Sequence, residues 1–124
     1  MPPLTVLELY VSDLERSRRF YTCLGLTFTR EQYGDRPVHY ATLVDGDIIL
    51  RLLPAGEGPP TRTRLGFALT SPGAVAETVG ATRYSVKDRR GMLLTALDPD
   101  GNVVELTSLT DFERDFGRSA SPDA

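Results

Sequence analysis

Two short stretches of this chain follow the same pattern: VDGDIILR at residues 44–51 and PDGNVVEL at residues 99–106. In each stretch an Asp-Gly turn signal precedes an apolar run, which predicts a tight turn that leads into a β-strand. The repeat extends upstream, because a strand-like segment runs into a helix-start signal near residue 12 and again near residue 71. We therefore interpret the chain as one structural unit that is used twice.

The length and composition are those of an ordinary globular protein. The chain has 124 residues, of which 40% are hydrophobic and 25% charged, with a net charge of -3. This length predicts one domain over residues 1–124. The acidic balance argues against a nucleic-acid partner, and no apolar run is long enough to cross a membrane. The single cysteine, Cys23, cannot form an internal disulfide and fits a reducing compartment, so we expect a cytoplasmic protein.

The first copy reads β-α-β-β-β. A strand is expected at residues 4–11, followed by a helix whose first turn is capped by Ser12 and Glu15 in a capping box. Gly25 is a suitable residue for the helix end. Further strands are expected at residues 26–30, 38–44 and 48–53.

The second copy has the same order of elements. Residues 55–63 are rich in Gly and Pro and are interpreted as a linker between module one, residues 4–54, and module two, residues 64–109. Module two is expected to contain a strand at residues 64–70, a short helix that Ser71 caps, and three more strands. These three strands are expected at residues 82–86, 92–97 and 103–109. Residues 110–124 are expected to form a polar tail.

Several local motifs connect the repeat to a known family. The first strand leads into VSDLERS at residues 11–17, FY at 20–21 and LGLTF at 24–28, and the second copy ends in DPDGNVVEL at 98–106. In these motifs the chain resembles the vicinal oxygen chelate superfamily, which includes glyoxalase I, extradiol dioxygenases, fosfomycin resistance enzymes and bleomycin resistance proteins. The resemblance implies an α+β fold in which two tandem βαβββ modules form a curved mixed sheet around a cleft, usually in a homodimer.

Family enzymes bind a divalent metal ion through side chains on the first and last strands of the modules. The resemblance places these positions at Val6, Leu50, Arg64 and Glu105. An aliphatic side chain offers no electron pair to a cation and a guanidinium group repels it, so only Glu105 is suited to bind metal. We therefore expect no metal and no other cofactor, which makes the chain closest in character to the metal-free bleomycin resistance branch.

Val6 and Leu50 would line the site, and four more residues are candidates for ligand contacts: Glu8, His39, Arg64 and Glu105. Glu105 faces either solvent or a cavity, and Glu8 shares a strand face with Val6 and is either functional or simply exposed. Arg64 would form an ion pair with Glu105 or bind an anionic ligand, and is otherwise a surface residue like Arg62.

Histidine and aromatic residues allow two readings as well. His39 is the only histidine, so it lines the site or has a structural role, and a two-histidine metal site is impossible. Four aromatic residues are candidates for the wall of a ligand site, although core packing explains them equally well: Tyr10, Phe28, Tyr33 and Tyr40.

The leading hypothesis is a metal-independent small-molecule binding protein that sequesters a drug or secondary metabolite. The first alternative is an enzyme. It is either a glyoxalase-like lyase or a dioxygenase with an atypical metal site built from Glu8 and Glu105, with or without His39, or an acid–base isomerase that uses Glu8 and Glu105. The second is an interaction module with a vestigial cavity. The expected partners are a small-molecule ligand and a second copy of the chain, with neither nucleic acid nor a membrane.

Overall fold

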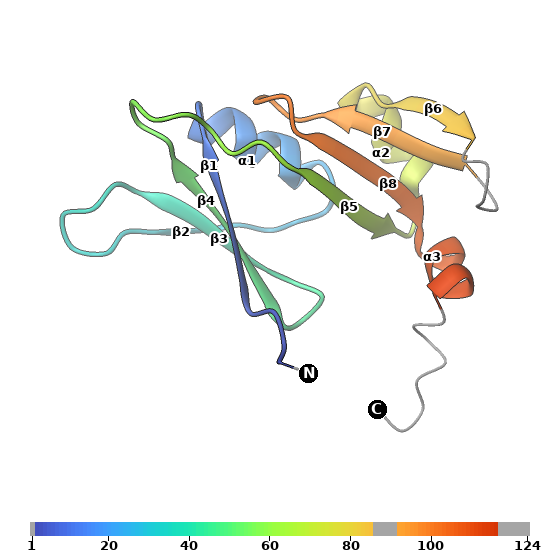
Figure 1. Cartoon of the computed structure of the whole chain (residues 1–124), viewed down its shortest axis with the longest axis horizontal. Coiled ribbons are helices and arrows are strands. Elements are labelled where there is room, and N and C mark those ends of the chain that lie inside the picture. The colour runs from blue at the N-terminus through green and yellow to red at the C-terminus, as the bar shows by residue number, and fades with distance from the viewer. Residues whose placement is uncertain (1, 86–91, 117–124) are drawn as a thin grey trace. The chain divides into compact units, whose positions relative to one another are not determined.

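Two four-stranded mixed sheets, each with a helix on one face, make up the fold (Figure 1). The structure is a computed structural model that describes residues 2–85 and 92–116. By their contacts the residues divide into two units, which are Met1–Arg62 with Asp98–Gly101, and Thr63–Leu97 with Asn102–Ala124. The predicted α+β class and the β-α-β-β-β order of both modules are confirmed.

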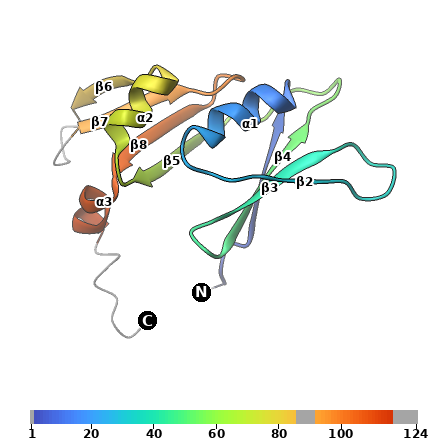
Figure 2. The same cartoon turned by 180° about the vertical axis from the view of Figure 1, so that it is seen from behind.

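Module one has its strands in the order β1-β4-β3-β2. Its elements are β1 (Val6–Val11), α1 (Leu14–Thr22), β2 (Thr29–Glu31), β3 (His39–Val44) and β4 (Ile48–Pro54). The first strand runs parallel to β4, and the other neighbouring strands are antiparallel. Figure 2 shows α1 lying along one face of this sheet.

The face of this sheet that α1 covers holds the core of the module. Leu9 on β1 and Leu52 on β4 are opposite each other in the parallel register and are fully buried, together with Tyr21 on α1. Because side chains alternate along a strand, the residues between them point to the other face. The alternation of the sequence thus separates a closed apolar face from an open one.

The loop at Asp98–Gly101 belongs to the first unit although it lies late in the sequence. The buried Tyr21 hydroxyl donates a hydrogen bond to Asp98 Oδ2 at 2.6 Å. Ser12 donates to the Asp100 carboxylate through both its backbone N–H and its hydroxyl. These bonds hold the loop against both ends of the segment that contains α1.

The start of α1 differs from the predicted capping box. Asp13 is the N-cap residue, and its Oδ1 accepts a hydrogen bond from the N–H of Arg16 at 3.1 Å. Ser12 does not cap the helix because its hydroxyl is bonded to Asp100. Local spacing alone therefore assigned the cap one residue too early.

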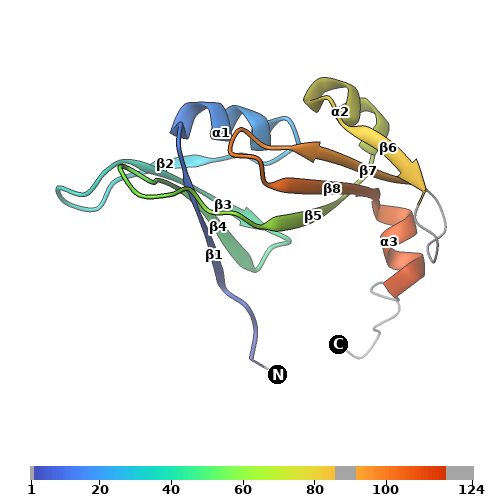
Figure 3. The ribbon, with the colours of Figure 1, turned by 45° about the horizontal axis from the view of Figure 1, so that its top comes forward.

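Module two has the strand order β5-β8-β7-β6, equivalent to that of module one. Its elements are β5 (Arg64–Leu69), α2 (Pro72–Val79), β6 (Thr82–Ser85), β7 (Met92–Leu97) and β8 (Val103–Ser108). The helix α2 lies over one face of the sheet (Figure 3). Val104 and Leu106 on β8 are fully buried, and Leu94, Ala96 and Ala76 complete this core.

A third helix, α3 (Leu109–Phe116), follows β8 where the sequence predicted only a polar tail. Ser108 caps the first turn of α3, because the Ser108 Oγ accepts a hydrogen bond from the N–H of Asp111 at 3.0 Å. The spacing of Leu109, Phe112 and Phe116 was the overlooked helical signal. The part of the expected tail at residues 117–124 lies outside the described residues.

Among the helices of the described residues, none is long and apolar enough to cross a membrane.

The two Asp-Gly turns that revealed the repeat have different lengths. The turn between β3 and β4 joins the paired residues Val44 and Ile48 and has positive φ at Asp45 (56°) and Gly46 (78°). The turn between β7 and β8 joins the paired residues Leu97 and Val103 and is therefore longer. The Asp-Gly pair lies one residue later between Leu97 and Val103 than between the equivalent residues Leu43 and Ile49. An alignment of the modules through these pairs is therefore one residue out of register with the strands.

Candidate functional site

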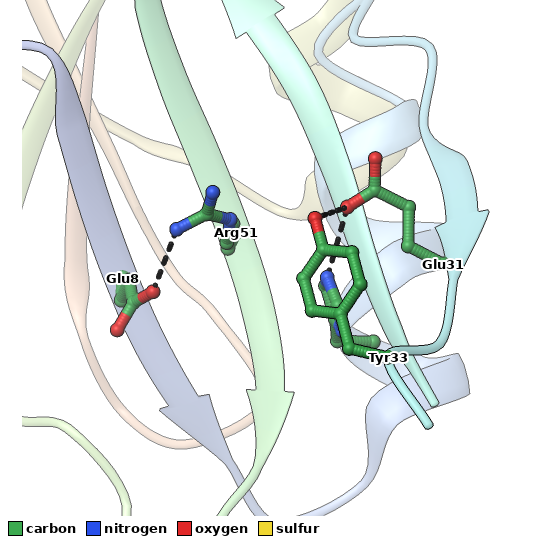
Figure 4. A network of polar contacts seen from close by, with 5 residues as sticks. Glu8, Glu31, Tyr33 and Arg51 are labelled. Atoms are coloured by element: carbon green, nitrogen blue, oxygen red, sulfur yellow. Dashed lines mark hydrogen bonds and ion pairs between the residues drawn. The ribbon is translucent and has the colours of Figure 1, made fainter. Parts of the chain in front are cut away.

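The open face of the module-one sheet carries Glu8 on β1 and its direct neighbour Arg51 on β4. The Arg51 Nη1 donates a hydrogen bond to Glu8 Oε2 at 3.0 Å, so the two side chains form an ion pair across the strands (Figure 4). The hydrogen bond with the Glu8 carboxylate raises the pKa of Arg51. Among the described residues, no acceptor bonds to the buried Nε of Arg51.

Leu50 was expected at this site, and the structure corrects that prediction. Leu50 is only 2% exposed and lies on the α1 face with Leu52. The first residues of β1 and β5, Val6 and Arg64, pair with Ile49 and Val103 respectively. Arg51 follows Ile49 by two residues, just as Glu105 follows Val103 by two. Arg51 is therefore the residue of β4 that corresponds to Glu105 on β8. The Asp-Gly pair begins two residues after Leu43 in module one but three after the equivalent Leu97 in module two, which caused the error of one residue. A one-residue slip moves a side chain to the other face.

A second polar cluster on the same sheet joins β2 and β3. His39 is 4% exposed, and its Nε2 lies 2.9 Å from Glu31 Oε1, which also accepts a hydrogen bond from the Tyr33 hydroxyl at 3.1 Å (Figure 4). Because a carboxylate only accepts, the His39 Nε2 carries the hydrogen of this bond. The hydrogen bonds from His39 and Tyr33 lower the pKa of Glu31. The rings of Tyr33 and His39 are 5.0 Å apart between centroids.

A cavity of about 300 Å³ lies beside both clusters. It is bounded by β1, β4, the first residue of β3 and the loop between β2 and β3. Its lining residues are Glu8, Tyr10, Tyr33, Arg36, Pro37, His39, Arg51, Leu53 and Pro54. Two rings, several apolar side chains and a few charged groups are the usual composition of a small-molecule site.

Two other hollows have fewer recognition groups. One of about 530 Å³ lies in module one and has Glu31 as the sole ionisable residue of its described lining. Another, of about 470 Å³, lies in module two, where the charged residue of the described lining is Arg64. The smaller cavity therefore offers the more specific chemistry.

In module two, Arg64 and Glu105 form an ion pair, which is one of the alternatives that the family resemblance left open for Arg64. The Nε of Arg64 donates to Glu105 Oε2, reaching across diagonally because the direct neighbour of Glu105 is Gly66. The Arg64 side chain is 55% exposed and that of Glu105 is 20% exposed. The pair is thus partly solvated.

The predicted site residues are therefore distributed over two places. Glu8 and His39 line the module-one cavity, and Val6 shares the open face with Glu8 without lining it. The prediction missed Arg51 and Arg36. A charged residue within the apolar run of β4, IILRLLP, was the available signal for Arg51.

The side chains at the family's metal positions do not fit a divalent cation. After the correction at β4, these positions hold Val6, Arg51, Arg64 and Glu105. Whichever of these four residues share a site, they offer one carboxylate and two guanidinium groups. The positive charge of a guanidinium group repels a metal cation. Within the described residues, no group of three or more His, Cys, Asp or Glu side chains is arranged to hold a metal ion.

The sequence matches the model of a protein family over most of its length. Residues 4–106 match the Glyoxalase/Bleomycin resistance protein/Dioxygenase superfamily. The chain belongs to this superfamily, as its motifs and the βαβββ order of both modules indicated. No curated protein matches the chain in a sequence comparison.

Solved structures share the fold at low sequence identity. TnmS3, an antibiotic binding protein from Streptomyces sp. CB03234, is 22% identical with a TM-score of 0.64, over 87% of this chain and 96% of that one. A lactoylglutathione lyase from Agrobacterium tumefaciens is 17% identical with a TM-score of 0.64, over 88% and 96%. TioX from Micromonospora sp. ML1 is 17% identical with a TM-score of 0.62, over 86% and 98%. These likenesses establish the fold and leave the activity open.

Proposed function

We propose that this chain is a small-molecule binding protein that sequesters a drug-like compound or secondary metabolite without using a metal ion. The observation that carries the proposal is the pair of arginines, Arg51 and Arg64, at two of the four positions where family enzymes bind their metal. Each guanidinium is paired with a carboxylate, Glu8 or Glu105, so the charge that a metal would otherwise supply is already present.

The module-one cavity supports a binding role. It combines apolar surface with a small number of charged groups, and a site of this kind selects a ligand by shape and by a few polar contacts. The fold is shared with TnmS3, which is described as an antibiotic binding protein, so the architecture is compatible with such a function. An open cavity also disfavours the vestigial interaction module, in which side chains would fill that space.

One observation favours a second candidate, an acid–base isomerase. His39 lines the cavity and its ring is oriented by the Glu31 carboxylate, an arrangement that suits proton transfer. Glu8 would be the second proton-transfer group, but its side chain is engaged in the ion pair with Arg51. Conversion of bound ligands by the wild type, lost in a His39→Gln variant that still binds them, would favour the isomerase.

We also propose a cytoplasmic homodimer. Several leucines are more than half exposed, among them Leu4, Leu43 and Leu97, and a second copy would cover such apolar surface. The mass measured by light scattering at micromolar concentration should then be that of two chains. A monomeric mass would contradict the dimer without affecting the binding role.

The decisive test joins metal analysis to ligand screening. The protein is purified without a histidine tag, its zinc, nickel, manganese and iron contents are measured by mass spectrometry, and a thermal-shift screen of aromatic natural products follows. We expect far less than one metal ion per chain and a higher melting temperature with some compounds, since a ligand that binds only the native state stabilises it. Stoichiometric metal with Glu105 as a ligand would overturn the proposal.

A further inference from the structure

We propose that the module-one cavity binds a flat aromatic molecule with one anionic oxygen group, a carboxylate or a phenolate. In this arrangement Arg36 receives the anionic group, and Tyr10 and Tyr33 contact the aromatic ring. The inference rests on the proposed binding function and specifies the class of ligand.

The charges of the cavity favour an anion. Its lining contains one acidic residue, Glu8, and two arginines, Arg36 and Arg51. Glu8 and Arg51 neutralise each other in their ion pair. Arg36 makes no ion pair with any carboxylate among the described residues, so its positive charge is available to a ligand. Guanidinium groups bind carboxylates through charge-assisted hydrogen bonds, and a cationic ligand would instead be repelled.

The backbone of one turn places Arg36 and Tyr33 together at the cavity. The N–H of Arg36 donates to the Tyr33 carbonyl at 3.1 Å, and the Gln32 side-chain amide donates to the Arg36 carbonyl at 2.9 Å. Gly34 has a φ of 59°, which the turn accommodates because glycine has no Cβ. The cationic group and one aromatic ring are therefore presented by the same short segment.

The aromatic surface is exposed and partly fixed in position. Tyr10 is 45% exposed and Tyr33 is 55% exposed, so both rings can gain contacts from a ligand. The Tyr33 hydroxyl is bonded to Glu31 and its ring lies against His39, which limits its rotamers before a ligand arrives. Large rings with few accessible rotamers lose little entropy on binding. A volume of about 300 Å³ is suited to one or two fused rings.

Three naphthalene probes test the ligand class, because they share one ring system and differ in charge. They are 2-naphthoate, the neutral 2-naphthamide and the cationic 2-naphthylmethylammonium, each titrated into the ¹⁵N-labelled full chain at pH 7. We expect the tightest binding for 2-naphthoate and the weakest for the ammonium compound. The amide signals that shift should be those of Tyr33, Arg36, His39 and Arg51.

Two variants with opposite expected effects locate the anion, and a third is the control. Arg36→Gln should weaken 2-naphthoate by about 3- to 10-fold and leave 2-naphthamide nearly unchanged. Glu8→Gln should strengthen 2-naphthoate by about 2- to 5-fold, because Arg51 then lacks its carboxylate partner. Arg30→Gln should have no effect, because Arg30 is on the opposite face of β2. General damage to the fold cannot produce a gain and a loss together.

The outcomes distinguish this inference from the proposed function. Equal or tighter binding of the neutral or cationic probe in the cavity, or equal effects of Arg36→Gln and Arg30→Gln, would overturn the anionic class and leave the binding function standing. No saturable binding of 2-naphthoate up to millimolar concentration would also overturn the class. If every compound in the thermal-shift screen fails as well, the proposed function falls with it.

Discussion

Glu8 and Arg51 lie directly opposite each other on the parallel strands β1 and β4, and their side chains form an ion pair at 3.0 Å. In module two the position of Arg51 is taken by Glu105, whose partner Arg64 comes from the first strand. The acid and the base have thus exchanged strands between the two modules. Each sheet keeps a pair of opposite charges on its open face, and among the described residues no three His, Cys, Asp or Glu side chains come together to hold a metal ion.

Removing the Tyr21 hydroxyl should destabilise the protein markedly. A Tyr21→Phe variant leaves the buried Asp98 carboxylate without this hydrogen bond, and burial together with that bond raises the pKa of Tyr21. Hydrogen bonds to charged groups contribute about 1.5–3 kcal/mol, and we expect the free energy of unfolding to fall by that amount in urea titrations. Tyr10→Phe, at an exposed ring, should change it by less than about 0.5 kcal/mol. Similar losses in both variants would contradict the role of this bond.

The stabilising contribution of Glu31 should be lost in acid. Its pKa is lower in the native state than the ordinary value of 4.5, so its contribution is complete above that value and is lost as the pH falls through the native pKa. The unfolded state then binds protons more readily than the native state. Glu31→Gln should therefore be less stable than the wild type at pH 7, and this difference should shrink as the pH approaches 3.

The measurement is chemical denaturation at a series of pH values. Glu57→Gln is the control, because Glu57 is exposed in the linker and should leave the curve unchanged. A difference in the free energy of unfolding between the wild type and Glu31→Gln that stays constant from pH 7 to pH 3 would contradict this prediction. It would show that Glu31 does not cause the loss of stability in acid.

Arg64 should matter more than its neighbour Arg62. Arg64→Leu leaves the Glu105 carboxylate without its guanidinium partner, whereas Arg62 is an exposed residue of the linker. Because Arg64 is itself half-exposed, we expect a loss of only about 0.5–1 kcal/mol in the free energy of unfolding, and almost none for Arg62→Leu. Equal and negligible effects in urea denaturation would show that the pair contributes nothing to stability.

A side chain at Gly46 should destabilise the turn between β3 and β4. This residue has a φ of 78°, and Gly46→Ala should cost about 1 kcal/mol although nothing obstructs the new Cβ. Gly73 in α2 has an ordinary φ and open space, so Gly73→Ala should stabilise the protein by up to about 1 kcal/mol. The melting temperatures of both variants test this: that of Gly46→Ala should fall because of backbone strain, and that of Gly73→Ala should rise because of helix propensity. A stabilised Gly46→Ala would contradict the assigned turn geometry.

Much of the fold could be predicted because it depends on local patterns. The turn signals, the apolar alternation of β8 and the helix starts identified both modules. The family resemblance offered the pairing of Arg64 with Glu105 as one alternative, and the structure contains it. The helix α3 was missed because its apolar residues are few and lie in a polar segment. The cap of α1 was misplaced because Ser12 is bonded to Asp100, which is distant in sequence.

The sequence by itself determined the order of the elements and the class of fold, because turn chemistry and side-chain periodicity act over a few residues. Tertiary structure alone decided which residue of β4 joins Glu8. That choice depends on the register in which β4 pairs with β1, and an offset of one exchanges a buried Leu50 for a cavity-lining Arg51. The cavity itself has the same origin, because strand pairing and one loop bring together residues that are separated by tens of positions in the chain.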